Sequence, residues 1–170
     1  MQQPSKDNLS FLPFRPIQPQ DNPHLAAIIR AGIIDMGVPT QGTAYSDPTT
    51  DHLFELFQTP GAYYHVCVSD DHEVMGGCGV YPTPGLPKGC AEMVRFFLKP
   101  SAQGRGLGYR LMRTSIYTAQ TLGYSQLYIE TFPEMKAAVH LYEQAGFEYL
   151  PKAMGNSGHP ACTVWMMKGI

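Results

Sequence analysis

Residues 98–113 read Leu-Lys-Pro-Ser-Ala-Gln-Gly-Arg-Gly-Leu-Gly-Tyr-Arg-Leu-Met-Arg. They follow a run of strand-type residues and place three glycines at alternate positions, Gly104, Gly106 and Gly108, where a helix is predicted to begin. Alternate glycines let backbone N–H groups point at one place because no Cβ blocks the approach. The first turn of the helix adds free N–H groups and the positive end of its dipole. The stretch therefore predicts a strand–loop–helix unit that binds a phosphate, and more specifically a pyrophosphate.

The glycine spacing separates three kinds of phosphate site. A dinucleotide fingerprint, G-x-G-x-x-G, requires a third glycine at position 109, where the chain has Tyr109. Glu130 lies near the place of a ribose-binding acid, so an NAD site stays open as an alternative. A Walker A loop is absent because no Gly-Lys-Ser/Thr follows the glycines. The pattern that fits is Gln103-x-x-Gly106-x-Gly108.

This pattern matches the Q/R-x-x-G-x-G/A signature that holds the pyrophosphate of coenzyme A. At this point the chain resembles the GNAT superfamily of acyl-CoA-dependent N-acetyltransferases. A second block, Leu141-Tyr142-Glu143-Gln144-Ala145-Gly146-Phe147, resembles the family segment L-Y-E-x-x-G-F. The resemblance extends from Phe11 to the end of the chain. It implies that the cofactor contacts are the backbone of Phe96, Phe97 and Leu98 and the loop residues Gln103, Gly104, Arg105, Gly106, Leu107, Gly108 and Tyr109.

The resemblance also implies the fold. It is an α/β (α+β) fold of the GNAT type, a central mixed and mostly antiparallel sheet flanked by helices and splayed at its fourth and fifth strands. Periodicity and turn residues predict strands at 11–17, 63–69, 73–81, 90–98, 126–131, 147–150 and 163–168. They predict helices at 21–36, near 51–57, from the glycine loop to Gly123, and at 134–145. We expect residues 1–10 to be a flexible tail and residues 11–170 to form a single N-acetyltransferase domain.

The composition is that of an ordinary globular chain of 170 residues, 44% hydrophobic and 15% charged. No apolar run reaches the ~20 residues that span a bilayer, and no signal-peptide core is present, so we expect a cytoplasmic protein without a membrane partner. The four cysteines have no framework spacing and predict reduced thiols: Cys67, Cys78, Cys90 and Cys162.

Charge is unevenly distributed along the chain. Residues 31–87 contain seven acids and neither Lys nor Arg, whereas residues 93–129 contain five basic residues and no acid. One interpretation is chance scatter, which short chains often show. The other is that the basic segment faces a polyanionic cofactor and the acidic segment, with Asp35, Asp47 and Asp51, faces a cationic acceptor. No basic surface large enough for nucleic acid is expected.

Transfer of an acetyl group from a thioester to an amine requires a base for the ammonium proton, donors for the carbonyl oxygen and an acid for the leaving thiolate. Tyr142 matches the tyrosine that points at the coenzyme A sulfur in the family, and packing in an apolar stripe is the alternative. Glu92 is the candidate base because an acid inside an apolar strand has a raised pKa. A role in holding the sheet or orienting the substrate is the alternative for Glu92.

Other chemistry finds less support. His65 with Cys67, and His159 with Cys162, have spacings that a metal could use, but no four-ligand set emerges, so no metal is expected. A cysteine nucleophile would require a pair such as Cys90 with His65. The asparagine that binds pantetheine in many family members is replaced here by Met135, and Lys136 or His140 is open as a substitute.

The function expected from the resemblance is transfer of an acetyl group from acetyl-CoA to a primary amine of a small molecule or peptide by direct attack. The alternative is a non-catalytic acyl-CoA-binding sensor or interaction module with the same fold. A homodimer is possible with either function.

Overall fold

The computed structural model describes residues 13–170, so the predicted tail and Phe11 of the first predicted strand lie outside the described residues. The elements are β1 (Phe14–Pro16), α1 (Asn22–Met36), α2 (Leu53–Leu56), β2 (Tyr63–Val68), β3 (Val74–Tyr81), β4 (Cys90–Leu98), α3 (Leu107–Thr121), β5 (Gln126–Thr131), α4 (Lys136–Gln144), β6 (Glu148–Tyr149) and β7 (Val164–Gly169). Short 3-10 turns lie at Pro19–Asp21, Pro48–Asp51 and Pro100–Ala102.

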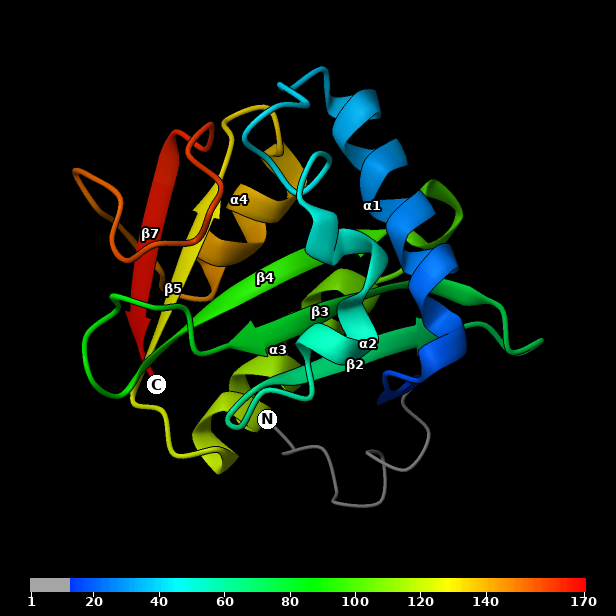
Figure 1. The fold of residues 1–170 in the computed structure, drawn as a ribbon, viewed down its shortest axis with the longest axis horizontal. Coiled ribbons are helices and arrows are strands. Elements are labelled where there is room, and N and C mark those ends of the chain that lie inside the picture. Colours follow the sequence, from blue (N-terminus) through cyan, green and yellow to red (C-terminus); the bar gives the residue numbers. More distant parts are fainter. Residues whose placement is uncertain (1–12) are drawn as a thin grey trace.

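The strands form one mixed sheet in the order β1-β2-β3-β4-β5-β7-β6. All neighbours are antiparallel except β4 and β5, which are parallel and pair only from Cys90–Gln126 to Glu92–Tyr128. Beyond Glu92 the two strands diverge, and Figure 1 shows them opening into a V. The prediction of a mixed, mostly antiparallel sheet splayed at its fourth and fifth strands is confirmed.

Helices cover both faces of the sheet, and each face has its own apolar core. On one face, Leu25, Ile29 and Ile33 of α1 pack with Leu53 of α2 and Val66 of β2. On the opposite face, residues of α3 and α4 pack against the other side chains of the strands, among them Leu111, Met112, Tyr142, Leu127 and Met166. In Figure 1, α1 and α2 lie in front of the sheet and α3 lies behind it.

A β-bulge interrupts β4 in the middle of the sheet. Gly77 of β3 pairs with Phe97, but Gly79 pairs with Val94, so β4 has one residue more than its partner. Arg95 takes up this residue with φ +52°, in the left-handed region that residues other than glycine seldom adopt. The bulge turns Arg95 to the α1 face, the face on which Val94 already lies. Strict alternation would have placed the guanidinium in the apolar core under α3.

The glycines of β3 permit a close backbone approach at this point. A Cβ on Gly76 would collide with the carbonyl oxygen of Phe97, and one on Gly77 would collide with Tyr64. Glycine in a strand interior often marks such a bulge or close backbone approach. The predicted helix at 134–145 begins two residues later, because Met135 closes a turn onto Phe132 and has a non-helical ψ of 56°.

Candidate active site

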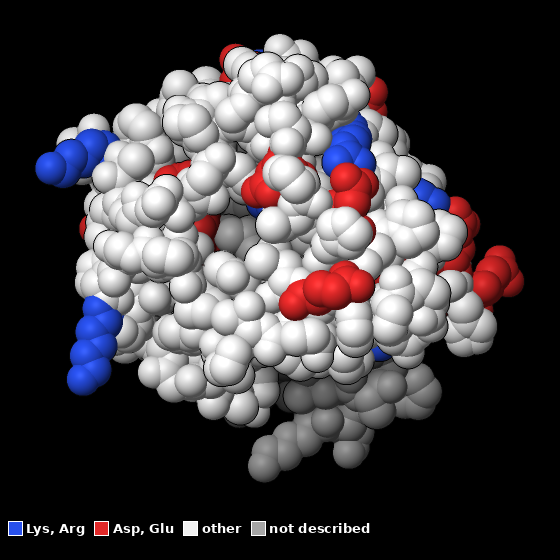
Figure 2. Space-filling view, viewed as in Figure 1, with Lys and Arg blue, Asp and Glu red and all other residues white. Residues whose placement is uncertain are grey.

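Two neighbouring hollows lie on the α1 face where β4 and β5 diverge. The splay cavity, of about 70 Å³, lies between the two strands and is lined by Glu92, Arg95, Phe96, Glu130, Tyr142 and His159, among others. The loop cavity, of about 180 Å³, lies beside it under the connecting loops and shares Glu92, Val94, Arg95 and His159 with the first. Figure 2 shows a hollow near the middle of this face with acidic side chains at its rim.

Glu92 occupies the last position at which β4 pairs with β5, and it lines both cavities. Its residue is only 4% exposed, and its Oε2 accepts a hydrogen bond from the hydroxyl of Thr83. Burial raises the pKa of Glu92 to about 7, and the charge of Glu130 adds to the rise, while Thr83 and Arg95 oppose it. A carboxyl group with this pKa can accept a proton near neutral pH and release it again.

Tyr142 projects from α4 into the splay cavity from the opposite side of the sheet. Its ring packs between Phe96 and Phe147, with centroid separations of 6.2 Å and 5.7 Å. Burial raises the pKa of Tyr142, so its phenol keeps its proton at neutral and alkaline pH. No side chain or backbone group of residues 13–170 forms a hydrogen bond with the phenol oxygen, which leaves it available as a donor.

The glycine loop connects β4 to α3 on the surface. Gly104 and Gly106 have φ of +76° and +73°, and a Cβ built on either glycine would meet no atom within 4 Å. The first backbone bond into the helix runs from the N–H of Arg110 to the oxygen of Gly106, so the N–H groups of the preceding turn remain free. Gln103 stiffens the loop by donating from Nε2 to the oxygen of Leu98 at 3.0 Å.

These features fit the diphosphate and pantetheine of coenzyme A. An exposed loop with free N–H groups and open space beside two left-handed glycines suits a diphosphate. The unpaired edges of β4 and β5 beyond Glu92 suit the amides of a pantetheine arm, which can add to a strand edge like a peptide. Phe96 and Leu98 turn their side chains toward the α3 face, and Phe97 turns toward α1, so the backbone is what these residues present to the splay.

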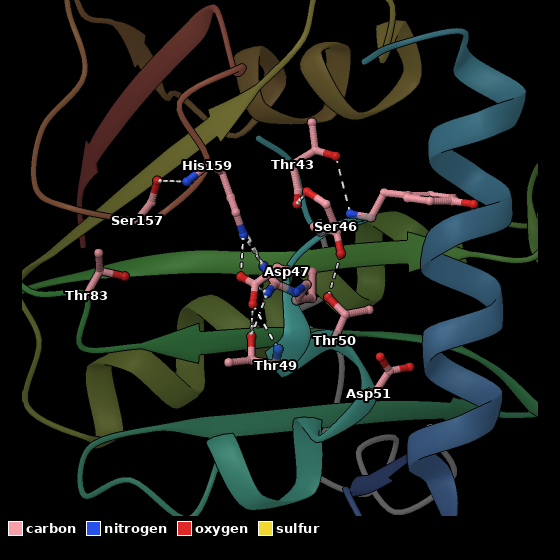
Figure 3. A network of polar contacts seen from close by, with 12 residues as sticks. Thr43, Ser46, Asp47, Thr49, Thr50, Asp51, Thr83, Ser157 and His159 are labelled. Carbon is pink, nitrogen blue, oxygen red and sulfur yellow. Dashed lines mark hydrogen bonds and ion pairs between the residues drawn. The ribbon is translucent and has the colours of Figure 1, made fainter. Parts of the chain in front are cut away.

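Three segments that are distant in sequence meet at the bulge, where Asp47 and His159, labelled in Figure 3, lie close together. Arg95 contacts both of them, and we call the contact of Asp47, Arg95 and His159 the clasp. Nη2 of Arg95 donates to Oδ2 of Asp47 at 2.9 Å, and Nε2 of His159 lies 2.7 Å from the same oxygen. Partial burial opposes ionisation of Asp47, but hydrogen bonds from Thr49 and His159 and the charge of Arg95 hold its pKa well below the usual range. Burial, followed by the charge of Arg95, lowers the pKa of His159. At neutral pH the clasp is thus one ion pair and a neutral imidazole.

Connecting loops close over the loop cavity. The backbone N–H of Asn156 donates to the oxygen of Pro84 at 2.7 Å, which joins the β6–β7 loop to the β3–β4 loop. The N–H of Ala161 donates to the oxygen of Gly42 at 3.1 Å, which joins the β6–β7 loop to the α1–α2 loop. The site beside Glu92 is therefore built from segments that the fold, and not the sequence order, brings together.

The structure corrects the charge-based expectations at several positions. Arg95 does not face the glycine loop, because the bulge turns it toward Asp47. Asp47 lines the loop cavity but is already paired, and Asp51 forms a surface ion pair with Arg30 at 2.6 Å. Asp35 lines a different hollow between α1 and the start of the glycine loop. Among residues 13–170, the acids of the site that form no ion pair are Glu92 and Glu130.

Sequence reasoning considered Glu130 only as a ribose ligand and missed its place in this site. Tyr128 and Glu130 alternate with the apolar residues Leu127 and Ile129, which belong to the α3 core. This alternation puts Glu130 on the same face as Glu92, two positions beyond the last pair of the parallel ladder. That spacing in the sequence was the signal that could have identified it.

The remaining candidates are dispersed. His65 bonds to Thr118 at 2.8 Å, and burial lowers its pKa to about 4. The thiol of Cys90 has its pKa raised to about 11 by burial, which disfavours a thiolate nucleophile. Residues 13–170 contain no group of three or more His, Cys, Asp or Glu side chains placed to hold a metal ion. In the same part of the chain, no helix is long and apolar enough to cross a bilayer.

Comparisons with known proteins agree with this geometry. A family model described as the acetyltransferase (GNAT) family matches residues 31–147. The uncharacterized N-acetyltransferase YjgM of Escherichia coli (strain K12) is 34% identical over 152 residues, which cover 89% of this chain and 90% of that protein.

Solved structures confirm the fold. A GNAT-family acetyltransferase of Staphylococcus aureus Mu50 superposes with a TM-score of 0.76 at 12% identity, over 92% of this chain and 97% of that one. A phosphinothricin acetyltransferase of Sinorhizobium meliloti, solved in complex with acetyl-CoA, gives a TM-score of 0.74 at 19% identity, over 92% and 87%. Family model, relative and fold agree with one another: the chain belongs to the acetyltransferase (GNAT) family and is an N-acetyltransferase.

Proposed function

We propose that this N-acetyltransferase moves an acetyl group from acetyl-CoA to a primary amine by direct attack, with Glu92 as the base and Tyr142 as the acid. One observation supports this most strongly. A buried carboxyl group from β4 and a buried phenol from α4 line the same small cavity, and the strands around it diverge. A carboxyl group that can accept a proton near neutral pH and a phenol that is still protonated there thus border one space.

Acetyl-CoA, the co-substrate of GNAT homologues, would be held by backbone groups of this chain. We assign the diphosphate to the free N–H groups of the glycine loop. The residues expected to contact it are Gln103, Gly104, Arg105, Gly106, Leu107, Gly108 and Tyr109. The edge of β4 at Phe96, Phe97 and Leu98 would receive the pantetheine arm and offer an N–H group to the acyl oxygen. The open space beside Gly104 and Gly106 supports this assignment.

The bound thioester supplies the acetyl group, and the residues of the chain manage the protons. Glu92, in its carboxylate form, takes a proton from the ammonium nitrogen of the acceptor, directly or through a water. The amine lone pair then forms the new C–N bond while the C–S bond breaks. Tyr142 gives its phenolic proton to the departing sulfur, and the second proton of the amine nitrogen restores the phenol.

A coupled assay of thiol release tests this function. Purified protein, acetyl-CoA and a panel of primary amines should release coenzyme A in proportion to the amide formed, and mass spectrometry should find the acetylated amine. Calorimetry of acetyl-CoA binding in the absence of amine supplies the control. Tight binding without turnover of any amine would contradict the proposal and favour an acyl-CoA-binding module.

A further inference from the structure

Glu130 is held rigidly at the mouth of the splay. One carboxylate oxygen, Oε1, accepts from the hydroxyl of Tyr128 at 2.7 Å, and the other, Oε2, accepts from the hydroxyl of Ser157. Both donors are neutral, so they fix the carboxylate without cancelling its charge. Tyr128 is itself fixed, because its oxygen accepts from the backbone N–H of Met154 at 2.9 Å.

The charges around the splay cavity do not balance. No Lys, Arg or His of residues 13–170 forms an ion pair with Glu130 or Glu92, since the guanidinium of Arg95 pairs with Asp47. Burial and Arg95 lower the pKa of His159 and keep its ring neutral at pH 7. Glu92 is only 4% exposed and lines the cavity, and its Oε1 has no hydrogen-bond partner among residues 13–170. A cavity bordered by two carboxyl groups that form no ion pair favours a cation.

Deepening the proposed function, on which this inference rests, we propose that Glu130 is a specificity-determining residue that binds a second cationic group of the acceptor, and that the acceptor is a small diamine. Glu92 removes the proton from the amino group that reacts, and Glu130 binds the second amino group, which keeps its positive charge. The molecule is small because the two cavities are about 70 Å³ and 180 Å³ and lie under loops that hydrogen-bond to one another.

Binding of a cation at Glu130 would also activate the base. The negative charge of Glu130 contributes to the raised pKa of Glu92, so its neutralisation lowers that pKa and favours the carboxylate form. The charge of Glu130 also raises the pKa values of Tyr128, His159 and Cys162, so its neutralisation lowers those pKa values as well. The other titratable or charged groups that line the two cavities with Glu92, or lie next to it in β4, are Asp47, Tyr81, Cys90, Arg95 and Tyr142.

Three acceptors with the same four-carbon chain test the specificity: putrescine, n-butylamine and γ-aminobutyrate, whose far ends are cationic, neutral and anionic. The wild-type kcat/KM should be about tenfold higher for putrescine than for n-butylamine, and lowest for γ-aminobutyrate. The preference for putrescine should shrink as salt is added. A ratio no greater than the statistical advantage of a second amino group would overturn the inference.

Variants then identify the residue. Glu130→Gln should remove the preference, so that the ratio of kcat/KM for putrescine to kcat/KM for n-butylamine falls about tenfold. Loss of the Glu130 charge also lowers the pKa of Glu92, which acts on both amines alike and leaves this ratio as the readout. Ser157→Ala removes a hydrogen bond to Glu130 but not its charge, so its preference should remain that of the wild type. If Glu130→Gln lowered kcat/KM equally for putrescine and n-butylamine, Glu130 would belong to the proton transfer, and the inference would be overturned.

A readout independent of turnover accompanies these rates. NMR titration of the side-chain carboxyl of Glu92 in the free protein should show a lower pKa in Glu130→Gln than in the wild type. An unchanged titration would contradict the coupling. If the wild type acetylates none of these three amines and no other amine, the proposed function fails. If it acetylates monoamines and diamines with equal kcat/KM, only the inference fails.

Discussion

At the scale of single residues, the phenol of Tyr142 should matter for chemistry and little for cofactor binding. Tyr142→Phe keeps the ring that packs on Phe96 and Phe147 and removes only the proton donor. We expect kcat to fall roughly 10- to 1,000-fold with the Kd for acetyl-CoA almost unchanged. Steady-state kinetics and calorimetry measure the two quantities. Wild-type turnover from neutral to alkaline pH would leave Tyr142 a packing residue.

Glu92 should control the acidic limb of the pH profile. With a pKa of about 7, its carboxylate form becomes populated as pH rises through neutrality, and kcat/KM should rise with it. Glu92→Gln should lower kcat/KM about 100-fold near neutral pH and remove this inflection, so that the rate follows only the pKa of the acceptor.

Thr83→Val provides the matched control for Glu92. It removes the hydrogen bond that stabilises the carboxylate form, so the inflection should move to higher pH and remain visible. If Glu92→Gln keeps the wild-type inflection, the base is another group and Glu92 is structural.

Residue types indicated part of this site and missed the rest for a physical reason. Glu92 stood out because a carboxylate in an apolar strand is costly, whatever its partners are. The pairing of Asp47 with Arg95 and His159 could not be predicted, because it depends on one bulged residue and on loops 112 positions apart. The sequence showed five basic residues between positions 93 and 129, but it did not show which face of the fold each side chain points to.

At the scale of elements, the glycine loop and the first turn of α3 should decide cofactor affinity. Gly106 has φ +73° and open space beside it, so Gly106→Val adds both backbone strain and a side chain where the diphosphate would lie. We expect loss of acetyl-CoA binding by calorimetry. Arg105→Ala should weaken binding modestly and in a salt-dependent way.

Gly123, just beyond the other end of the same helix, supplies the control. It has φ +90° and also has open space around it, so Gly123→Val imposes similar strain far from the loop. The stability of Gly123→Val to urea should fall about as much as that of Gly106→Val, but the affinity of Gly123→Val for acetyl-CoA should equal that of the wild type. Equal affinities in the two variants would rule out the glycine loop as the diphosphate site.

Elements were predicted well where periodicity is long and glycine or proline marks the ends. α3 and β4 have the expected extents because an apolar stripe runs to Gly123 and a polar loop follows Leu98. The short elements were less accurate. The predicted helix at 51–57 is a 3-10 turn followed by the four residues of α2, and β6 has two residues where four were expected. In such elements a few tertiary contacts outweigh local preference.

At the scale of the whole molecule, the clasp should stabilise the packing of the loops on the sheet. Arg95 and Asp47 have side chains 5% and 19% exposed, so Asp47→Ala leaves a buried guanidinium without its partner. We expect the free energy of unfolding in urea to fall by about 3 kcal/mol at neutral pH. Asp51→Ala, which breaks the surface pair with Arg30, should have a much smaller effect.

The pH dependence of this loss has a definite sign. The pKa of Asp47 is lower in the folded protein than in the unfolded chain, where it is about 3.9. Its contribution is therefore complete above the unfolded pKa and disappears as pH falls below that value toward the folded pKa. The stability difference between wild type and Asp47→Ala should be constant near neutral pH and shrink in acid. A difference that grew in acid would contradict the ion pair.

The division of the chain into a tail at 1–10 and one domain at 11–170 stays a prediction, as does the homodimer. The fold, in contrast, follows from its two sequence blocks because each fixes a local geometry that the rest of the sheet must accommodate. The glycine block sets how β4 turns into α3, and the segment at 141–147 sets how α4 turns into β6. The acceptor site depends on the loops between these blocks, whose conformations the sequence leaves open.

The divergence of β4 and β5 leaves backbone groups in the centre of the sheet without strand partners, since the two strands pair with each other at only three positions. A ligand that fills this gap binds only the folded chain, and at 100 times its Kd it adds about 2.7 kcal/mol to the stability. Hydrogen exchange of the amides that point into the splay, at 93–98 and 129–131, should slow when acetyl-CoA is added; unchanged exchange would place the ligand elsewhere. A cell short of acetyl-CoA would then lose more of this enzyme to proteolysis, so its abundance would follow the metabolic supply of acetyl groups.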